Sequence, residues 1–205
     1  MDDGEFDRAL IAAAFQVAAE RGWRAASIAE AARAAGLPLP RARERFPGRA
    51  ALLVRFGRHA DQGALQEAAT EGSPRDRLFD LLMRRIDALQ AHRAGVLALL
   101  RALPSEPPTA LLLALATRRS MRWMLNAAGI PTAGIGGELR VRGLIAVWLW
   151  TVRAWQRDET QDLSATMAAL DTALQRAEQA ADWLGWRRRP PEPPAEPEVS
   201  PETSA

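Results

Sequence analysis

Apolar side chains recur every three or four positions along most of the chain, and no long stretch alternates apolar and polar residues. This spacing is typical of amphipathic helices, so the sequence predicts helices throughout and no sheet. In the N-terminal part it predicts a helix ending at Arg21-Gly22, short helices over residues 28–35 and 41–46, and a long helix over 49–70. The segment Leu37-Pro38-Leu39-Pro40 forms the turn between the short helices.

Prolines and glycines divide the rest of the chain into further helices. Ser73 is expected to be an N-cap residue, because Pro74 suits the first position of the helix that follows. Five more helices are predicted, over residues 75–91, 94–103, 109–128, 138–157 and 162–184. The proline- and glutamate-rich residues that follow cannot bury a core, which predicts a disordered tail.

The first three helices fit a helix-turn-helix, in which two short helices joined by a turn with a glycine pack on a longer one. The predicted fold is therefore all-α, with three parts. Residues 1–58 form a helix-turn-helix domain, residues 59–186 form a helical body, and residues 187–205 form the tail.

Composition narrows the possible functions. The chain has no cysteine, which excludes disulfides, thiolate zinc sites and cysteine nucleophiles. The acidic N-terminus lacks the pattern of a signal peptide, and the longest apolar run, residues 144–150, is too short to span a membrane, so we expect a soluble, cytoplasmic protein. His59 and His92 are isolated, and Asp158-Glu159 is expected to be a surface pair. We therefore expect no enzyme, no cofactor and no metal site.

Basic charge is concentrated near the N-terminus. Residues 21–58 contain nine arginines and two glutamates, although the net charge of the whole chain is only +2. A basic patch at one end of a chain is typical of a surface that meets phosphate. A solvated arginine face with no partner is the simpler alternative.

The third predicted helix has distinct faces on a helical wheel. Leu39, Ala42 and Phe46 form an inward stripe, and Arg43 lies on the flank. Arg41 and Arg45 face outward, where arginine could read guanine in a major groove. A hairpin that only packs against the first helix fits the same pattern, so the geometry leaves both interpretations open.

Three motifs make the stretch from Ile11 to Leu53 resemble the N-terminal domain of TetR-type transcriptional regulators. They are Ala19–Trp23 (AERGW), Ser27–Leu37 (SIAEAARAAGL) and Phe46-x-x-Arg49-x-x-Leu52-Leu53. The resemblance implies a homodimer, a recognition helix over residues 41–46 and a ligand pocket in the body. The predicted contacts to double-stranded DNA are Arg24, Ser27, Arg41, Arg43, Arg45 and Arg49.

The chain departs from this family in the turn and in the recognition helix. Pro38 and Pro40 stand where family members usually carry serine and glycine, and they remove two backbone N–H groups that could meet the DNA backbone. Arg43 stands where the family places a tyrosine that contacts phosphate. An arginine can still hold a phosphate at that position.

The body carries two apolar patterns with predicted roles. A stripe on the last helix is predicted to form the dimer interface, and the alternative is an ordinary core stripe within one subunit. Its residues are Leu163, Met167, Leu170, Leu174, Ala177 and Ala181. A second set is predicted to line an apolar ligand pocket, because tryptophan and methionine accommodate flat or flexible molecules. These residues are Met83, Met121, Trp123, Met124, Trp148, Val152 and Trp155.

The C-terminal third also resembles the TetR-fold lipid-binding accessory proteins of ubiquinone biosynthesis. The similar residues are Asp158, Asp162, Thr166, Leu170 and Asp171, after a tryptophan-rich helix. This resemblance implies a lipid in place of DNA, and Trp183, Trp186 and Arg187 could then contact a membrane surface. The favoured function is a DNA-binding regulator released by a hydrophobic ligand, and the alternative is a lipid-binding protein that does not bind DNA.

Overall fold

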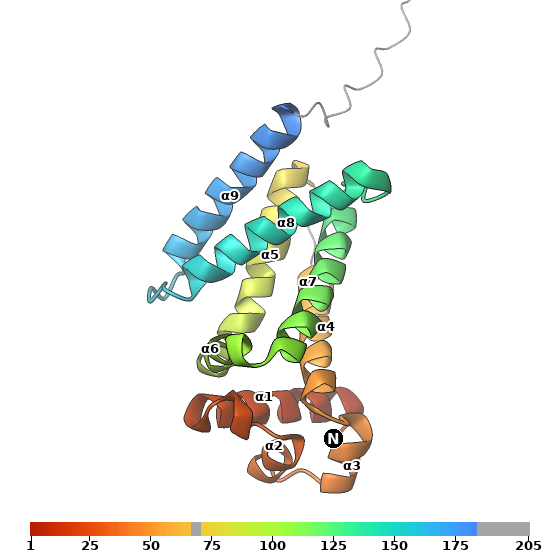
Figure 1. Ribbon diagram of the computed structural model, residues 1–205, viewed down its shortest axis with the longest axis vertical. Helices are drawn as coiled ribbons and strands as arrows, with labels where there is room; N and C mark the ends of the chain where they lie inside the picture. The colour runs from red at the N-terminus through yellow and green to blue at the C-terminus, as the bar shows by residue number, and fades with distance from the viewer. Residues whose placement is uncertain (67–70, 184–205) are drawn as a thin grey trace, which may run out of the picture.

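The computed structural model describes residues 1–66 and 71–183, and within these ranges the chain forms nine α-helices and no strand (Figure 1). The predicted all-α fold is confirmed. The helices are α1 (Asp3–Arg21), α2 (Ile28–Ala34), α3 (Leu39–Arg45), α4 (Arg49–Gln66), α5 (Pro74–Gln90), α6 (Arg93–Ala102), α7 (Pro107–Ala127), α8 (Gly134–Trp155) and α9 (Ser164–Trp183). Short 3-10 turns lie at Trp23–Ala25 and Leu103–Ser105.

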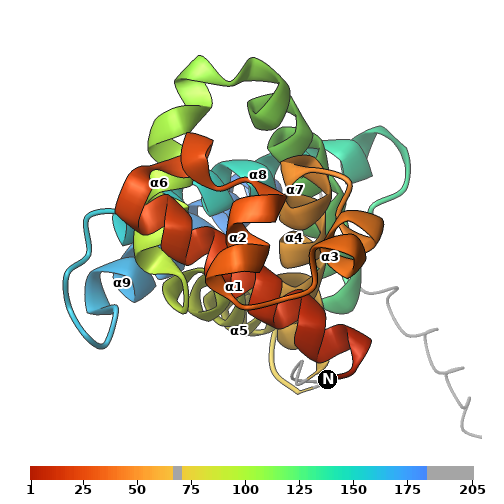
Figure 2. The same cartoon turned by 90° about the horizontal axis from the view of Figure 1, so that it is seen from below.

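The helices form a small head and a larger body (Figure 1). The head consists of α1, α2 and α3, and the view from below shows α2 and α3 on the outer side, away from the body (Figure 2). Helix α4 leaves the head and packs against α5 and α7, while α6 lies against α1. The predicted boundary between residues 58 and 59 falls inside α4, so this helix belongs to both parts.

Local signals explain where several helices begin. The Ser73 hydroxyl accepts a hydrogen bond from the Asp76 backbone N–H, and the Asp76 carboxylate accepts one from the Ser73 backbone N–H. Pro74 stands in the first turn, as predicted. Ser27 caps α2 by accepting from the Glu30 backbone. The Glu30 carboxylate pairs with Arg21 and Arg33.

The head and the body share one continuous apolar core. Phe6, Phe15 and Phe46 are buried in the head, and Leu82 and Trp155 are buried in the body. Helix α6 approaches α1 most closely at Gly95, where a Cβ atom would overlap the Phe15 backbone carbonyl. This close approach fixes the head directly against the body.

Three residues of the apolar stripe on α9 pack within the subunit and not at the predicted dimer interface, and the interface role of the other three stays a prediction. Leu163, Leu170 and Leu174 are buried, because α9 lies against α8 and α5 of the same chain. The remaining members of the stripe, Met167, Ala177 and Ala181, are partly buried. The spacing of apolar residues shows that a helix face is buried. It does not show whether the segment that buries this face belongs to the same chain.

No single helix in the described ranges is long and apolar enough to cross a membrane. The two segments Arg93–Ser105 and Pro107–Ala127 are together long and apolar enough for a membrane span, but a bend of 117° separates them. Trp183 is 88% exposed at the end of α9. Trp186, Arg187 and the predicted tail lie outside the described residues, so membrane contact through these residues stays a prediction.

Candidate nucleic-acid interface

Helix α3 is held in the head by its buried face. Ala42 and Phe46 are both buried against the core, as the helical wheel predicts. Leu39 is 42% exposed, so its predicted place in the inward stripe is wrong. The helix begins at Leu39, after the N-cap Pro38, and this start leaves the first turn at the surface.

Arg41 and Arg45 do not point freely outward, because acidic residues at the start of α1 hold them. Arg45 Nε donates to Asp7 Oδ1 at 2.7 Å and Arg45 Nη2 donates to Asp7 Oδ2 at 3.0 Å. Asp3 accepts from Arg41 Nη2 at 2.7 Å and lies 2.5 Å from Arg45 Nη1. Both arginines are therefore engaged within the head, which corrects their predicted outward placement.

The hydrogen bonds that hold Arg41 and Arg45 on α1 also shift the pKa values of the groups involved. The hydrogen bond from Arg41 holds the pKa of the Asp3 carboxyl below its usual value. The hydrogen bond to Asp7 raises the pKa of the Arg45 guanidinium above its usual value. Paired hydrogen bonds between a guanidinium and a carboxylate are directional, so they fix the orientation of α3 on α1.

The outward face of α3 consists of Leu39, Pro40, Arg43 and Glu44, which are all exposed. Among the described residues, the Arg43 side chain makes no ion pair or hydrogen bond. An exposed arginine at this place could donate two hydrogen bonds to guanine or contact a phosphate. Apolar side chains beside it could contact a thymine methyl group, and a glutamate could accept from cytosine.

The other predicted DNA contacts lie outside α3, in the turn before α2, at the start of α2 and at the start of α4. Ser27 is exposed at the start of α2. Arg24 is 71% exposed, and its Nε lies 3.9 Å from a Glu106 carboxylate oxygen. Arg49 Nη1 donates to the Trp23 carbonyl at 3.0 Å and lies 3.5 Å from Glu106, so this residue connects the head to the start of α7.

Comparisons with known proteins identify the fold. No family model and no curated protein matches the chain. A TetR transcriptional regulator from Nitrosomonas europaea ATCC 19718 matches with a TM-score of 0.69 and 22% identity, over 85% of this chain and 99% of that one. The chain has a TetR-like fold.

Two further solved structures agree with this fold. A TetR-family transcriptional regulator from Streptomyces coelicolor matches with a TM-score of 0.62 and 22% identity, over 91% of this chain and 87% of that one. A TetR transcriptional regulator from Rhodococcus sp. RHA1 matches with a TM-score of 0.57 and 20% identity, over 86% and 97% of the two chains. These structures lend no support to the resemblance with accessory proteins of ubiquinone biosynthesis.

The residues of the predicted ligand pocket do not all meet in the TetR-like body. Met121, Met124 and Trp155 are completely buried, Trp148 and Val152 are nearly so, and Met83 is partly buried beside them. Trp123 lies on the opposite side of α7 and is 56% exposed, so the structure separates it from the others. The ligand pocket itself stays a prediction.

A buried polar cluster in the body was missed by the sequence analysis. Arg85 on α5 forms an ion pair with Asp61 on α4, and Ser120 on α7 donates to the same carboxylate at 2.5 Å. The Arg85 guanidinium lies 5.0 Å from the centre of the Trp148 ring, and burial lowers its pKa to about 10. The sequence feature that could have predicted this cluster is the position of Arg85, which falls between Leu82 and Ile86 on an otherwise apolar helix face.

Proposed function

We propose that this chain is a transcriptional regulator of the TetR type that binds duplex DNA through the outward face of α3. The observation that carries the proposal is the different placement of the arginines on this helix. Arg41 and Arg45 fix the helix on α1 through Asp3 and Asp7, while Arg43 is left exposed at the outer end of the head. The TetR-like fold supports the same function.

In this proposal Arg43 makes the main polar contact with a base or a phosphate. Leu39 and Pro40 lie on the same face and provide apolar contacts in the major groove. Ser27 and Arg24 contact neighbouring phosphates, since both are exposed near the start of α2. Arg49 has a positioning role, because the Trp23 carbonyl and Glu106 already engage it.

We further propose a homodimer that uses the outward flanks of α8 and α9. Leu149 and Trp150 are exposed on α8, and Ala165 and Ala168 are exposed on α9. Large apolar side chains on one helix and small residues on the other allow two helix pairs to approach closely. A dimer places two heads on two half-sites of an operator.

The proposed regulator is a repressor that a hydrophobic small molecule releases from DNA. Helix α4 connects the head to the body, and its Asp61 is bound to α5 and α7 through Arg85 and Ser120. A ligand that moves α5 or α7 would therefore move α4 and change the spacing of the two heads. It can do so only if it binds the released state more tightly than the DNA-bound state.

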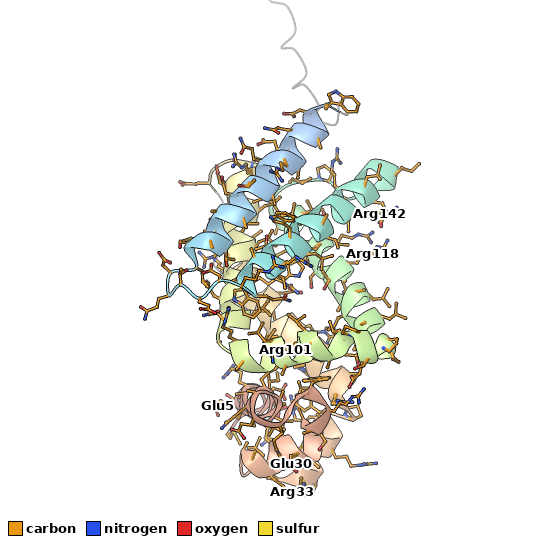
Figure 3. The ribbon with its side chains drawn as sticks, turned by 60° about the vertical axis from the view of Figure 1, so that its left-hand side comes forward. Glu5, Glu30, Arg33, Arg101, Arg118 and Arg142 are labelled. Carbon is orange, nitrogen blue, oxygen red and sulfur yellow. The ribbon has the colours of Figure 1, made fainter. Side chains whose placement is uncertain are left out.

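The DNA-binding role is tested by replacing Arg43 with alanine and measuring the affinity for a preferred duplex by fluorescence anisotropy. We expect a loss of about five- to 150-fold, which corresponds to ~1–3 kcal/mol. Arg101→Ala is the matched control, because Arg101 is an exposed arginine on α6 (Figure 3). Equal affinities for the two variants would contradict the proposed role of Arg43.

A further inference from the structure

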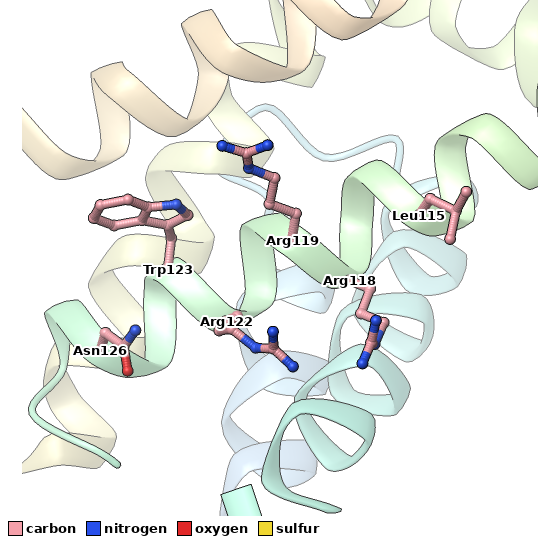
Figure 4. A pocket seen from close by; sticks show the side chains of 6 residues that line it. All are labelled: Leu115, Arg118, Arg119, Arg122, Trp123 and Asn126. Carbon is pink, nitrogen blue, oxygen red and sulfur yellow. The ribbon is translucent and has the colours of Figure 1, made fainter. Parts of the chain in front are cut away.

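The outward side of α7 carries a basic recess of about 440 Å³ (Figure 4). Its lining residues are Leu115, Arg118, Arg119, Arg122, Trp123 and Asn126. All six belong to α7, and none of them belongs to the DNA-binding face of the head. The recess is therefore a separate surface of the body.

Positive charge exceeds negative charge in this recess. A single carboxylate, Glu138 on α8, accepts from Arg118 Nη2 and Arg122 Nη2, both at 2.8 Å. Arg142 reaches the same carboxylate at 3.7 Å, and it lies beside Arg118 on one flank of the body (Figure 3). The side chain of Arg119 has no hydrogen bond or ion pair with any described residue.

The recess also offers apolar contacts and an unused donor. Trp123 and Leu115 are exposed two turns of α7 apart, which corresponds to about 12 Å along the helix. Arg122 Nε is shielded from solvent and finds no acceptor within the part of the chain that the structure describes. The surface thus suits an extended segment that carries both carboxylates and apolar rings.

The C-terminal segment of this chain has that composition. Residues 190–202 contain six prolines, four glutamates and no basic residue. They lie outside the described residues, which end with α9 at Trp183. The C-terminal ends of α9 and α7 both lie at the end of the molecule opposite the head (Figure 1). Residues 184–189 span about 20 Å when extended, which gives the segment room to reach α7.

We propose that residues 190–202 dock in the α7 recess, with glutamates on Arg118, Arg119 and Arg122 and proline rings on Trp123. Proline-rich segments favour the polyproline II helix, which rises about 3.1 Å per residue and binds aromatic surfaces. Because the segment is tethered, its effective concentration is in the millimolar range, and a weak contact is enough.

Disulfide trapping tests the docking in the full chain, which has no cysteine of its own. The double variant Leu115→Cys, Ala195→Cys places one thiol in the recess and one in the tail. The double variant Ala12→Cys, Ala195→Cys measures random encounters, because Ala12 is exposed in the head. We expect the recess pair to form a disulfide at least ten times faster. Equal rates would overturn the proposal.

Charge variants test how the tail is recognised. Replacing Glu192, Glu196 and Glu198 with glutamine in the recess pair should slow trapping at least five-fold, and 0.5 M salt should slow it similarly. Glu159→Gln, which changes an exposed glutamate outside the recess, should leave the rate unchanged. A trapping rate that is unchanged by these three substitutions would overturn the charge-based contact. A bond within one chain or between two chains supports docking, and the mass of the product shows whose tail is bound.

Discussion

At the scale of single residues, Asp158 shows how a buried carboxylate can organise a helix start. It accepts hydrogen bonds from Thr160 Oγ1 at 2.6 Å and from both the backbone N and Oγ1 of Thr166 at 2.7 Å. Asp158 is buried, so its predicted place in a surface pair with Glu159 is wrong. The sequence shows the pair at the end of a helix, but it does not show that α9 folds back over one member.

We predict that Asp158→Asn lowers the free energy of unfolding by about 1–3 kcal/mol at pH 7, because it weakens these charge-assisted hydrogen bonds. The hydrogen bonds from Thr160 and Thr166 hold the pKa of Asp158 well below its usual value. Stability from a lowered carboxyl pKa is complete above the unfolded value of about 4 and is lost as the pH falls below it. Urea denaturation of both proteins should therefore show a difference that narrows below about pH 4. A difference that does not change with pH would contradict this account.

His92 gives a second prediction for a single residue, because the fold favours its neutral form and not its charged form. Its ring lies 5.3 Å from the Phe15 ring and 5.8 Å from the Phe56 ring, and burial lowers its pKa. The folded protein therefore favours the neutral ring. We predict that stability falls as the pH drops below the unfolded histidine value of about 6.5, since the unfolded chain binds the proton more readily. His92→Gln should reduce this slope in thermal melts between pH 7.5 and 5.5, and an unchanged slope would rule out His92 as its source.

At the scale of elements, the head and the body meet where α1 and α6 cross. A side chain at Gly95 would overlap the Phe15 carbonyl, whereas a side chain at Gly63 on α4 would meet open space. We predict that Gly95→Ala destabilises the fold by about 1–3 kcal/mol, because the helices must separate. Gly63→Ala should instead stabilise it by about 0.5–1 kcal/mol through helix propensity. Chemical denaturation of both variants measures the sign of each change in the free energy of unfolding. Changes of the same sign would contradict the close crossing of α1 and α6.

The helices themselves were largely predictable, because periodicity and breakers are local properties of the sequence. The Ser73-Pro74 start of α5 and the short α2 appear where predicted, whereas α3 begins at Leu39, inside the predicted turn. The partner of each helix face was less predictable. Leu170 and Leu174 carry a pattern that suits either a subunit core or a dimer interface, and only the fold places them against α8 and α5.

At the scale of the whole molecule, the charge of the head depends on contacts between distant segments. The count over residues 21–58 predicts a strongly basic surface, but it omits the acidic start of α1. Asp3 and Asp7 reach Arg41 and Arg45 from 38 positions away in the sequence. A local count of charge cannot include such pairs, which explains why the predicted outward placement of these two arginines required correction.

The proposed dimer gives a prediction at the same scale. Trp150 on α8 and Trp123 on α7 are 54% and 56% exposed, so they form a matched pair on different surfaces. We predict that Trp150→Asp shifts the protein from dimer to monomer, because it places a charge in an apolar interface, while Trp123→Asp leaves the dimer intact. Sedimentation velocity distinguishes the two species. A dimer that survives Trp150→Asp would place the interface elsewhere.

Selection of bound duplexes from a random library tests the central claim, that the outward face of α3 reads DNA in a dimer. We predict enrichment of an inverted repeat whose half-sites lie about 10 base pairs, or a multiple of that spacing, apart. The enriched sequence should lose its preference when Arg43 is replaced with alanine. Recovery of no preferred sequence from the full chain, with weak and uniform binding to all duplexes, would contradict the account.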